Sequence, residues 1–397
     1  MRYLIPFLLR NEGICRPISP ILPEGVNKVL CNISVTGNGS DIIYNIRCTD
    51  YMYLVLNKSY SLMYTELPDH GQVISTNVTG VIHTHTLQPA INVYNDAPHF
   101  DFMFWNRYAG IEDMRLACWD GDLYGIGFTG NIIRDKLIPV IIKFNPDLTF
   151  GKAIYLDNGV PVEKNWQPVQ DMPFTFIYDP GSAVGDTASV ITIDPNNIDM
   201  NGMIKIHTKP FTNILSGSSQ LIPIGDMYLS ICHRRTASND PDTLHIVYNH
   251  YFVIYDRHFN IKQISKPFQF MEPTLEFCCG MYADNTNLYI SFNICDISTH
   301  IVSIPIDKFT ELLPTLMGEW DSDRAPEYYK DTLQYVHGYD ALLYNNLISD
   351  IGHEERYEIL RSSLPGVANP TTRNQILLHT YLRQHIPDPR ILDMICK

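Results

Sequence analysis

Two acids and an arginine stand close together in the segment Gly110-Ile-Glu-Asp-Met-Arg115, which lies between two apolar runs. The apolar runs are typical of β-strands, so the segment is expected to be the turn that re-enters a strand. Side chains in such a turn can converge on one site, where a carboxylic acid donates a proton and an arginine binds an anion. The same residues could instead form an ion-pair clamp between structural units. Glu112, Asp113 and Arg115 are therefore the first candidates for chemistry.

Short apolar segments must position these residues, because residues 1 to about 308 alternate between strand-like runs and polar turns at intervals of about 8 to 12 residues. The clearest runs cover residues 42–48, 51–56, 123–129, 137–144, 227–233, 251–255 and 288–293. They group into about five weakly similar modules of about 40 to 60 residues, which is typical of propeller blades. The sequence therefore predicts an all-β, five-bladed β-propeller over residues 1–308. The apolar residues 1–9, although interrupted by Pro6, are expected to form a buried strand.

The spacing of apolar residues changes from strand-like to helical after residue 308. Residues 327–351, 354–364 and 372–384 carry apolar side chains at helical spacing, with Pro and Gly near their ends. Residues 309–397 are therefore predicted to be a helical C-terminal extension. This extension could pack on the propeller, join two subunits in a homo-oligomer, or act as a lid.

Composition narrows the class of partner. The 397 residues carry a formal net charge of -14, which argues against a nucleic-acid binder, and no apolar run is long enough to span a membrane. The nine cysteines contain no C-x-x-C pair, so neither a disulfide framework nor a metal site is expected. Four N-x-S/T sequons begin at Asn32, Asn38, Asn57 and Asn77, and they matter only in a secretory compartment. The sequence favours a cytoplasmic protein that acts on a small molecule.

A propeller binds its ligand at the mouth of the central channel, where several blades each contribute side chains. Site residues should therefore be scattered along the chain, about one group for each module. The candidates are Asn45 and Arg47; Glu112, Asp113 and Arg115; Lys164 and Asn165; Gln220 and His233; and Glu276 and Asp296.

Several of these candidates also have a structural interpretation. Lys164 and Asn165 could form a simple turn, and His233 ends an apolar strand where a core histidine is common. Glu276 and Asp296 could cap backbone N–H groups of the last blade.

At this point the residues carry a resemblance to a known family. Gly110-Ile-Glu-Asp-Met-Arg115 looks like the G-x-E-D-P-R signature of glycoside hydrolase family 130, the β-mannoside phosphorylases, to which glycosyltransferase family 108 is similar. Residues 163–168 (Glu-Lys-Asn-Trp-Gln-Pro), 217–220 (Gly-Ser-Ser-Gln) and 231–233 (Ile-Cys-His) resemble further elements of that group, in the same order. The resemblance covers about residues 40 to 300. Met114 stands where proline is usual, and Ser218 and Ser219 replace paired glycines.

The chemistry expected is inverting cleavage of a glycosidic bond, which needs one proton donor and a nucleophile on the opposite face of the sugar. If phosphate is the nucleophile, a cluster of cations and donors replaces the second carboxylate, and Arg47, Arg115, Lys164 and His233 are the available set. Asn45, Glu112, Lys164, Asn165, Gln220, Glu276 and Asp296 are then the candidates for binding the sugar.

The resemblance implies that Asp113 is the general acid, with its proton relayed through a sugar hydroxyl, while Glu112 orients the sugar or Arg115. It also implies β-linked, mannose-type substrates, with inorganic phosphate or a sugar 1-phosphate as co-substrate and no cofactor. The reverse reaction would transfer the sugar from its 1-phosphate to an acceptor.

Three other functions stay open. A hydrolase would place a second carboxylate, such as Glu163, Glu276 or Asp296, about 6.5 to 9.5 Å from Asp113. A propeller without catalytic activity would bind glycans or proteins at the same channel mouth. A nucleotide-sugar transferase is the least favoured, because no G-x-G-x-x-G turn is present to hold a diphosphate.

Overall fold

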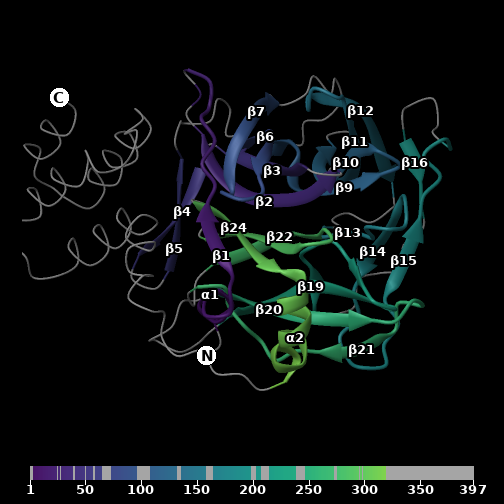
Figure 1. Ribbon diagram of the computed structural model, residues 1–397. Coiled ribbons are helices and arrows are strands. Elements are labelled where there is room, and N and C mark those ends of the chain that lie inside the picture. Colours follow the sequence, from purple (N-terminus) through teal and green to yellow (C-terminus); the bar gives the residue numbers. More distant parts are fainter. Residues whose placement is uncertain are drawn as a thin grey trace, which may run out of the picture.

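Strands dominate the protein, as the composition predicts. The computed structural model describes residues 3–24, 26, 28–38, 41–49, 51–56, 59–64, 73–95, 108–131, 136–157, 164–197, 203–206, 214–237, 246–271, 275–294, 296 and 298–318. Within these residues five β-sheets are arranged around a centre as the blades of a propeller, and a separate hairpin lies beside them (Figure 1). The predicted all-β, five-bladed propeller is therefore confirmed.

Each blade is an antiparallel sheet built mainly from consecutive strands. Blade 1 contains β2 (Val29–Asn38), β3 (Asp41–Thr49), β6 (Val73–His83) and β7 (Gln88–Asn95), with β8 (Tyr108–Gly110) parallel to β6. Blade 2 contains β9 (Glu112–Trp119), β10 (Asp122–Asn131), β11 (Lys136–Phe144) and β12 (Phe150–Asp157), with β16 (Met203–Lys205) parallel to β12. Blade 3 contains β13 (Gln167–Pro168), β14 (Thr175–Asp179) and β15 (Ser189–Thr192).

The last two blades complete the ring. Blade 4 contains β17 (Ser216–Gly217), β18 (Ile222–Ile224), β19 (Met227–Ala237), β20 (Ile246–Tyr255) and β21 (Ile261–Ile264). Blade 5 contains β22 (Glu276–Ala283), β23 (Asn287–Ile294), β24 (Ser298–Pro305) and β1 (Ile14–Pro17). The extra hairpin is β4 (Tyr51–Leu56) with β5 (Ser59–Tyr64).

The N-terminal segment closes the ring. Strand β1 pairs antiparallel with β24, with Ile14 opposite Ser303 and Pro17 opposite His300, so the two ends of the propeller share blade 5. The grouping of the sequence into successive modules does not contain this pairing, because nothing in a local pattern specifies a partner almost 300 residues away along the chain. Closure of this kind removes an exposed sheet edge.

Residues 4–9 form a helix rather than the predicted strand. Helix α1 (Leu4–Leu9) buries Leu4, Ile5 and Leu8 against the propeller, so the expectation of burial is right and that of a strand is wrong. Pro6 is tolerated because it lies in the first turn, where backbone N–H groups have no partner within the helix. Leu4 N and Ile5 N instead donate to the backbone oxygens of Gln269 and Phe270.

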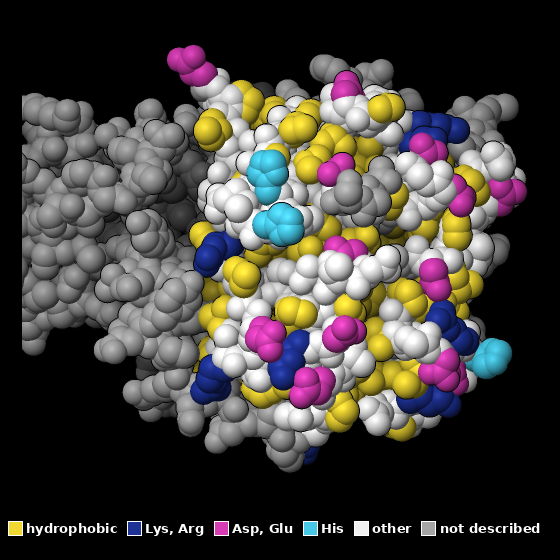
Figure 2. Space-filling view, viewed as in Figure 1, with side chains coloured by type: hydrophobic (Ala, Val, Ile, Leu, Met, Phe, Trp, Pro, Cys, Tyr) yellow, Lys and Arg dark blue, Asp and Glu magenta, His cyan; other side chains and the backbone are white. Residues whose placement is uncertain are grey.

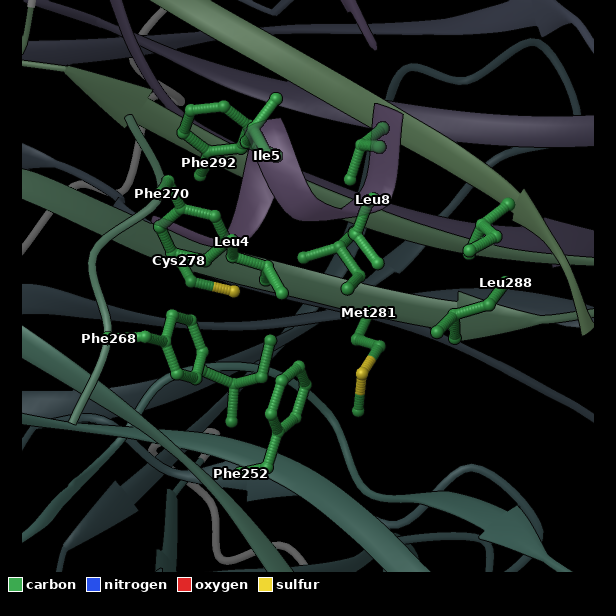
Figure 3. Close-up of a cluster of buried hydrophobic side chains, with 14 of the residues drawn as sticks. Leu4, Ile5, Leu8, Phe252, Phe268, Phe270, Cys278, Met281, Leu288 and Phe292 are labelled. Carbon is green, nitrogen blue, oxygen red and sulfur yellow. The ribbon is translucent and has the colours of Figure 1, made fainter. Parts of the chain in front are cut away.

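The largest apolar cluster lies between blades 4 and 5 and is covered by both helices. Figure 3 shows Leu4, Ile5 and Leu8 of α1 packed toward Phe252, Phe268, Phe270, Cys278, Met281, Leu288 and Phe292. Phe309 and Leu316 of α2 (Ile306–Met317) belong to the same cluster. Burial of this apolar area contributes the main favourable free energy of folding for this part of the protein.

Helix α2 begins just before the predicted boundary at residue 308, and residues 319–397 lie outside the described residues. The helical segments predicted there therefore stay predictions. Among the described residues, no helix is both long and apolar enough to cross a membrane.

The first strands of blades 1, 2 and 5 meet at the centre of the propeller, and each contains a β-bulge. Strands β2, β9 and β22 contact one another. In β9, Asp113 and Met114 lie opposite the single residue Gly127, and in β2 the register shifts between Cys31 and Ser34. Strand β22 shifts at Cys279. Bulges redirect individual side chains and are frequent next to functional sites.

Candidate functional site

Polar residues with left-handed backbone gather where the bulged strands meet. Asn32, Asp113, Asn165 and Asp296 have φ angles of 49°, 48°, 69° and 53°. Asparagine and aspartate tolerate this region better than other side chains, yet it still costs about 1 kcal/mol. Gly110, with φ of 82°, leads into the bulge, and a Cβ there would lie 1.8 Å from the backbone oxygen of Ser75. Strained backbone at several adjoining positions is typical of a functional site.

Glu112 is the centre of a buried ion-pair network. Its Oε1 accepts a hydrogen bond of 2.8 Å from Nη2 of Arg47, and its Oε2 accepts one of 3.1 Å from Nζ of Lys164. The side chains of Glu112 and Arg47 are 6% and 4% exposed, whereas that of Lys164 is 34% exposed. Arg47 also donates through Nε to Oγ of Ser75. Both basic candidates therefore lie at the acids, as the sequence predicts.

Asp113 is held through only one of its oxygens. Oδ1 accepts hydrogen bonds from Nδ2 of Asn32 at 2.5 Å and from Nη1 of Arg47 at 3.1 Å. Oδ2 has no hydrogen-bond partner among the described residues, and the side chain is 13% exposed. Burial acts to raise the pKa of Asp113, but Arg47, Lys164 and Arg115, together with the Asn32 amide, hold it below its ordinary value.

Arg115 is buried and bound mainly to backbone. Its guanidinium donates to the backbone oxygens of Ser218 at 2.9 Å, Asp113 at 2.7 Å and Gly217 at 3.3 Å, and to Oδ1 of Asn165 at 3.0 Å. These bonds join blade 2 to blade 4 and engage four of the five N–H groups that an arginine offers. Arg115 thus lies in the predicted site, but it is oriented toward the protein itself.

Asp296 is the third carboxyl group of this site. It is 9% exposed, and its Oδ1 accepts a hydrogen bond of 2.9 Å from Nδ2 of Asn293. Burial raises the pKa of Asp296 to about 6; Arg47 opposes this change, while Asp113 and Glu112 add to it. The charge of Asp296 therefore changes close to neutral pH.

His233 faces the site as a neutral ring. Its Nδ1 lies 2.8 Å from Oγ of Ser218, and Phe277 and Tyr248 contact the ring. Burial and, to a smaller extent, the charge of Arg115 together lower the pKa of His233 to about 3, while Asp113 opposes this change. A neutral imidazole can offer a hydrogen bond to an anion but no charge.

Lys164 and Asn165 present open donors side by side. Lys164 has Glu112 as its only hydrogen-bond partner among the described residues, although an ammonium group has three N–H donors. Burial acts to lower the pKa of Lys164, but the carboxylates of Glu112 and Asp113 raise it above its ordinary value. Asn165 accepts from Arg115 through Oδ1, and its Nδ2 has no partner in the described part of the chain. These two residues are therefore the donors best placed for an added anion.

Three further candidates are buried with structural partners. Nε2 of Gln220 donates to the backbone oxygens of Val35 and Leu116, and its Oε1 accepts from the backbone N–H of Met281, so all its hydrogen-bonding atoms join blades 1, 2 and 5. Asn45 bonds Asn77 and Thr79 within blade 1. These side chains are therefore engaged by structural partners, and their predicted sugar-binding role stays a prediction.

Glu276 behaves in the same way. Its two carboxylate oxygens accept from the backbone N–H groups of Phe270 and Met271 at 2.5 and 2.7 Å, and the residue is completely buried. This is the capping role that the sequence left open. Glu163 lies outside the described residues.

Asn32, Asn293 and Tyr248 lie in the site but were not predicted from the sequence. Asn32 attracted notice only as the start of a sequon, yet it is 4% exposed and its amide faces Asp113. Tyr248 contacts His233 and interacts electrostatically with Asp296 and Asp113. A polar residue inside an apolar strand is the only signal available, and it does not reveal a bulge. The Asn77 sequon is buried as well, with 1% exposure.

A metal site is not evident in the described residues, because no group of three or more His, Cys, Asp or Glu side chains is arranged to hold an ion.

Comparison with known proteins supports the fold. Neither a family model nor a curated protein sequence matches the chain. A solved member of the family 130 mannoside phosphorylases, a family described as containing hydrolases that target β-1,2 mannosidic linkages in Candida mannan, shares 11% identity over 77% of this chain and 97% of its own, with a TM-score of 0.50. A glycosyl hydrolase from Bacteroides ovatus shares 12% identity over 70% and 85%, with the same TM-score of 0.50.

A β-1,2-mannobiose phosphorylase from Listeria innocua shares 12% identity over 75% of this chain and 95% of its own, at a TM-score of 0.47. At these identities the two likenesses with a TM-score of 0.50 establish the fold, so the resemblance to family 130 propellers is confirmed at that level.

Proposed function

We propose that the protein is a carbohydrate-active enzyme that catalyses inverting phosphorolysis of β-linked, mannose-type glycosides, or the reverse transfer from a sugar 1-phosphate, with Asp113 as the general acid. The observation that carries this proposal is the state of Asp113. Oδ1 is held by Asn32 and Arg47, while Oδ2 has no partner in the described part of the chain and lies in the site that contains Lys164. The propeller fold shared with the mannoside phosphorylases supports the substrate class.

In the phosphorolytic direction, Asp113 gives a proton to the departing glycosidic oxygen through a sugar hydroxyl as the bond from that oxygen to C1 breaks. A phosphate oxygen forms the new bond to C1 from the opposite face, which inverts the anomeric centre. The product is an α-sugar 1-phosphate. The acid needs no metal, since the proton comes from the carboxyl group and the charge of phosphate is met by cations.

The low pKa of Asp113 fits this scheme only if substrate changes it. A bound phosphate dianion pairs with Lys164 and Arg47, which weakens the hold of those cations on the Asp113 carboxylate. The pKa of Asp113 then rises when the site is filled, and the group takes up the proton it must donate. Phosphate binding and acid catalysis are thereby linked.

The open donors of Lys164 and Asn165 support phosphate as the nucleophile. Arg47 adds positive charge beside them, and His233 adds a neutral donor or acceptor. Arg115 acts indirectly, because it fixes Asn165 and the backbone of Asp113.

Hydrolysis is the second candidate function, and Asp296 favours it. A water-activating base must be a carboxyl group near the acid, and Asp296 interacts electrostatically with both Asp113 and Glu112. In that case the cations would orient the sugar rather than bind phosphate.

The test is to incubate the protein with mannose 1-phosphate and a panel of sugar acceptors and to measure release of phosphate. We expect release by the native protein and a loss of about 100-fold or more in Asp113→Asn. The matched control is Asp171→Asn, an exposed aspartate paired with Arg257 on the surface, which should keep full activity. Equal turnover by the native protein and by Asp113→Asn would exclude Asp113 as the acid. Absence of turnover with every sugar phosphate, in folded native protein, would contradict the proposed reaction.

A further inference from the structure

The two aspartates of the site share one unusual arrangement. Asp113 accepts from Nδ2 of Asn32, and Asp296 accepts from Nδ2 of Asn293. Both asparagines are buried, with exposures of 4% and 0%. In both, the side-chain oxygen Oδ1 is buried without a hydrogen-bond partner among the described residues. The same pairing occurs twice, once between blades 1 and 2 and once within blade 5, which suggests a shared purpose.

The pair formed by Asn32 and Asp113 depends on two bulges in neighbouring blades. Asn32 lies in the bulge of β2 and Asp113 in the bulge of β9, and both have left-handed backbone. In a regular strand, successive side chains point to opposite faces of the sheet. The bulges break this alternation and direct Asn32 and Asp113 toward each other. Two strained positions thus serve one contact, which is 2.5 Å long.

The unpaired Oδ1 of Asn32 indicates that the Nδ2 group is the part of the amide that this position requires. A buried carbonyl oxygen without a partner lowers stability, and a smaller side chain would avoid that cost. The Nδ2 group, by contrast, has a charged partner, and hydrogen bonds to a carboxylate are stronger than neutral ones. The position therefore favours a donor directed at Asp113.

We propose that Asn32 is a positioning residue for Asp113: its amide fixes Oδ1, so that Oδ2 is the oxygen that exchanges the proton with substrate. This inference rests on the proposed role of Asp113. Arg47 holds the same oxygen from β3, and the bond of Arg115 to the backbone oxygen of Asp113 fixes the peptide at that position. Asp113 is therefore held at its backbone and at one carboxylate oxygen, which leaves a single atom for the reaction.

Other titratable groups surround Asp113, and Arg47, Lys164 and Arg115 are the charges that lower its pKa. The surrounding groups are Arg47 on β3, Arg115 on β9, Lys164 before β13, Cys31 on β2, His233 on β19, Tyr248 on β20, Cys279 on β22 and Asp296 after β23, with Glu112 next to Asp113 in the chain. Asn32 differs from all of them because it carries no charge and acts on Asp113 only through its directional hydrogen bond. Its removal should change the proton affinity of Asp113 without changing the net charge of the site.

The test is a titration of the Asp113 carboxyl group by carbon-13 NMR, with the signal assigned by its loss in Asp113→Asn. Asn32→Gly removes the amide and keeps a residue that accepts left-handed backbone. Asn32→Asp replaces the NH2 group by oxygen at the same size. We expect the pKa of Asp113 to rise in both variants, and more in Asn32→Asp, because a second carboxylate then faces the first.

Asn95→Asp is the control, since Asn95 is a buried amide that bonds Thr79 and the backbone of Leu148 and, within the described part of the chain, makes no hydrogen bond to the acids of the site. It should leave the titration of Asp113 unchanged. If Asn32→Asp does not fold, Asn32→Gly decides the result. An unchanged titration of Asp113 in folded Asn32→Gly would overturn the proposal. The measurement needs no substrate, so it remains decisive even if the protein turns over no sugar phosphate.

In protein that does turn over substrate, the pH profile supplies a second readout. The limb of the profile that reports Asp113 should move in the direction in which the NMR titration moves. A fall in rate with an unmoved profile would show a purely structural role for Asn32 and would also overturn the proposal.

Discussion

Two groups of buried polar residues lie near the centre of the propeller, and they differ in how completely their atoms are paired. The glutamine pair, Gln167 and Gln220, is neutral and bonds the backbone of neighbouring blades. The acid cluster consists of Glu112, Asp113 and Asp296 with Arg47 and Lys164, and it contains strained backbone and open donors. The difference indicates that one group holds the blades together, whereas the other is maintained at a cost to stability. Such a cost is typical of sites that serve function.

Charged side chains on one face of the molecule are mixed in sign. On the face shown in Figure 2, acidic and basic side chains lie interspersed among apolar and neutral ones. The described ion pair with the least exposed side chains instead belongs to the acid cluster, where exposure is 4% for Arg47 and 6% for Glu112.

The largest effect should come from breaking the glutamine pair. Gln220→Leu removes the partners of two backbone carbonyl groups and one backbone N–H group, each of which is buried. We expect the free energy of unfolding to fall by about 3 kcal/mol or more, measured by urea denaturation. Gln263→Leu, at an exposed position of β21, is the control and should change stability little. A loss of less than about 1 kcal/mol for Gln220→Leu would contradict the structural role.

Removal of a charge from the acid cluster should instead raise the free energy of unfolding at high pH. The raised pKa of Asp296 means that the folded protein binds a proton there more tightly than the unfolded chain does. The stability this provides is present at low pH and is lost as pH rises through about 6. Asp296→Asn removes the buried charge, so it should stabilise the protein at pH 8 by up to about 3 kcal/mol and have little effect below about pH 4.

The matched control for this experiment is Asp284, an aspartate whose pKa is lowered instead of raised. Asp284 accepts from backbone N–H groups of Thr286 and Asn287; burial opposes this effect, but the net result is a lowered pKa. Asp284→Asn should therefore destabilise the protein at neutral pH, and its effect should fade as pH falls. If Asp296→Asn destabilised the protein at pH 8, Asp296 would not carry the unfavourable charge described here.

The sequence alone did not predict which buried polar residues belong to the glutamine pair and which to the acid cluster. The strands were predictable because runs such as residues 137–144 and 288–293 are apolar, and both are strands of the blades. Asp113, Glu112, Arg47 and Lys164 were also found together as predicted. Gln220 was predicted to bind sugar, because a local motif shows the residue type but not the three backbone groups that it meets from other blades.

Bulges and ring closure were beyond sequence reasoning for a related reason. The pairing of β1 with β24 and the approach of Asn32 to Asp113 across 81 residues both depend on how the blades assemble. Helix α1 was predicted as a strand because six apolar residues cannot be assigned by periodicity alone.

A smaller effect is expected at Lys164. Lys164→Met removes the ammonium group that has the most unoccupied donors in the site while keeping much of the apolar stem. If phosphate is the nucleophile, the KM for phosphate should rise about 10- to 100-fold, which corresponds to the loss of one charge-assisted hydrogen bond. Steady-state kinetics at varied phosphate measures this. Lys262→Met, at a surface pair with Asp256, should leave the KM unchanged, and an unchanged KM in Lys164→Met would favour the hydrolase.

The smallest effect is expected at His233, whose imidazole ring should not titrate near neutral pH. Its lowered pKa means that the folded ring stays neutral between pH 5 and pH 8, and proton NMR of the imidazole should show no titration there. The neutral ring contributes stability above about pH 6.5, and this contribution is lost as pH falls toward 3. A titration of His233 near pH 6.5 would show that the ring is not desolvated and that it can bind phosphate as a cation.

The central claim is that the acid cluster performs phosphorolysis with inversion, and the most direct measurement is the identity of the first product. A β-1,2-mannobiose substrate, incubated with inorganic phosphate, can be followed by phosphorus and proton NMR in native protein and in Asp113→Asn. The account predicts α-mannose 1-phosphate as the first product, formed only with phosphate and lost in Asp113→Asn. Free mannose formed at the same rate without phosphate would contradict it and would assign the cluster to hydrolysis.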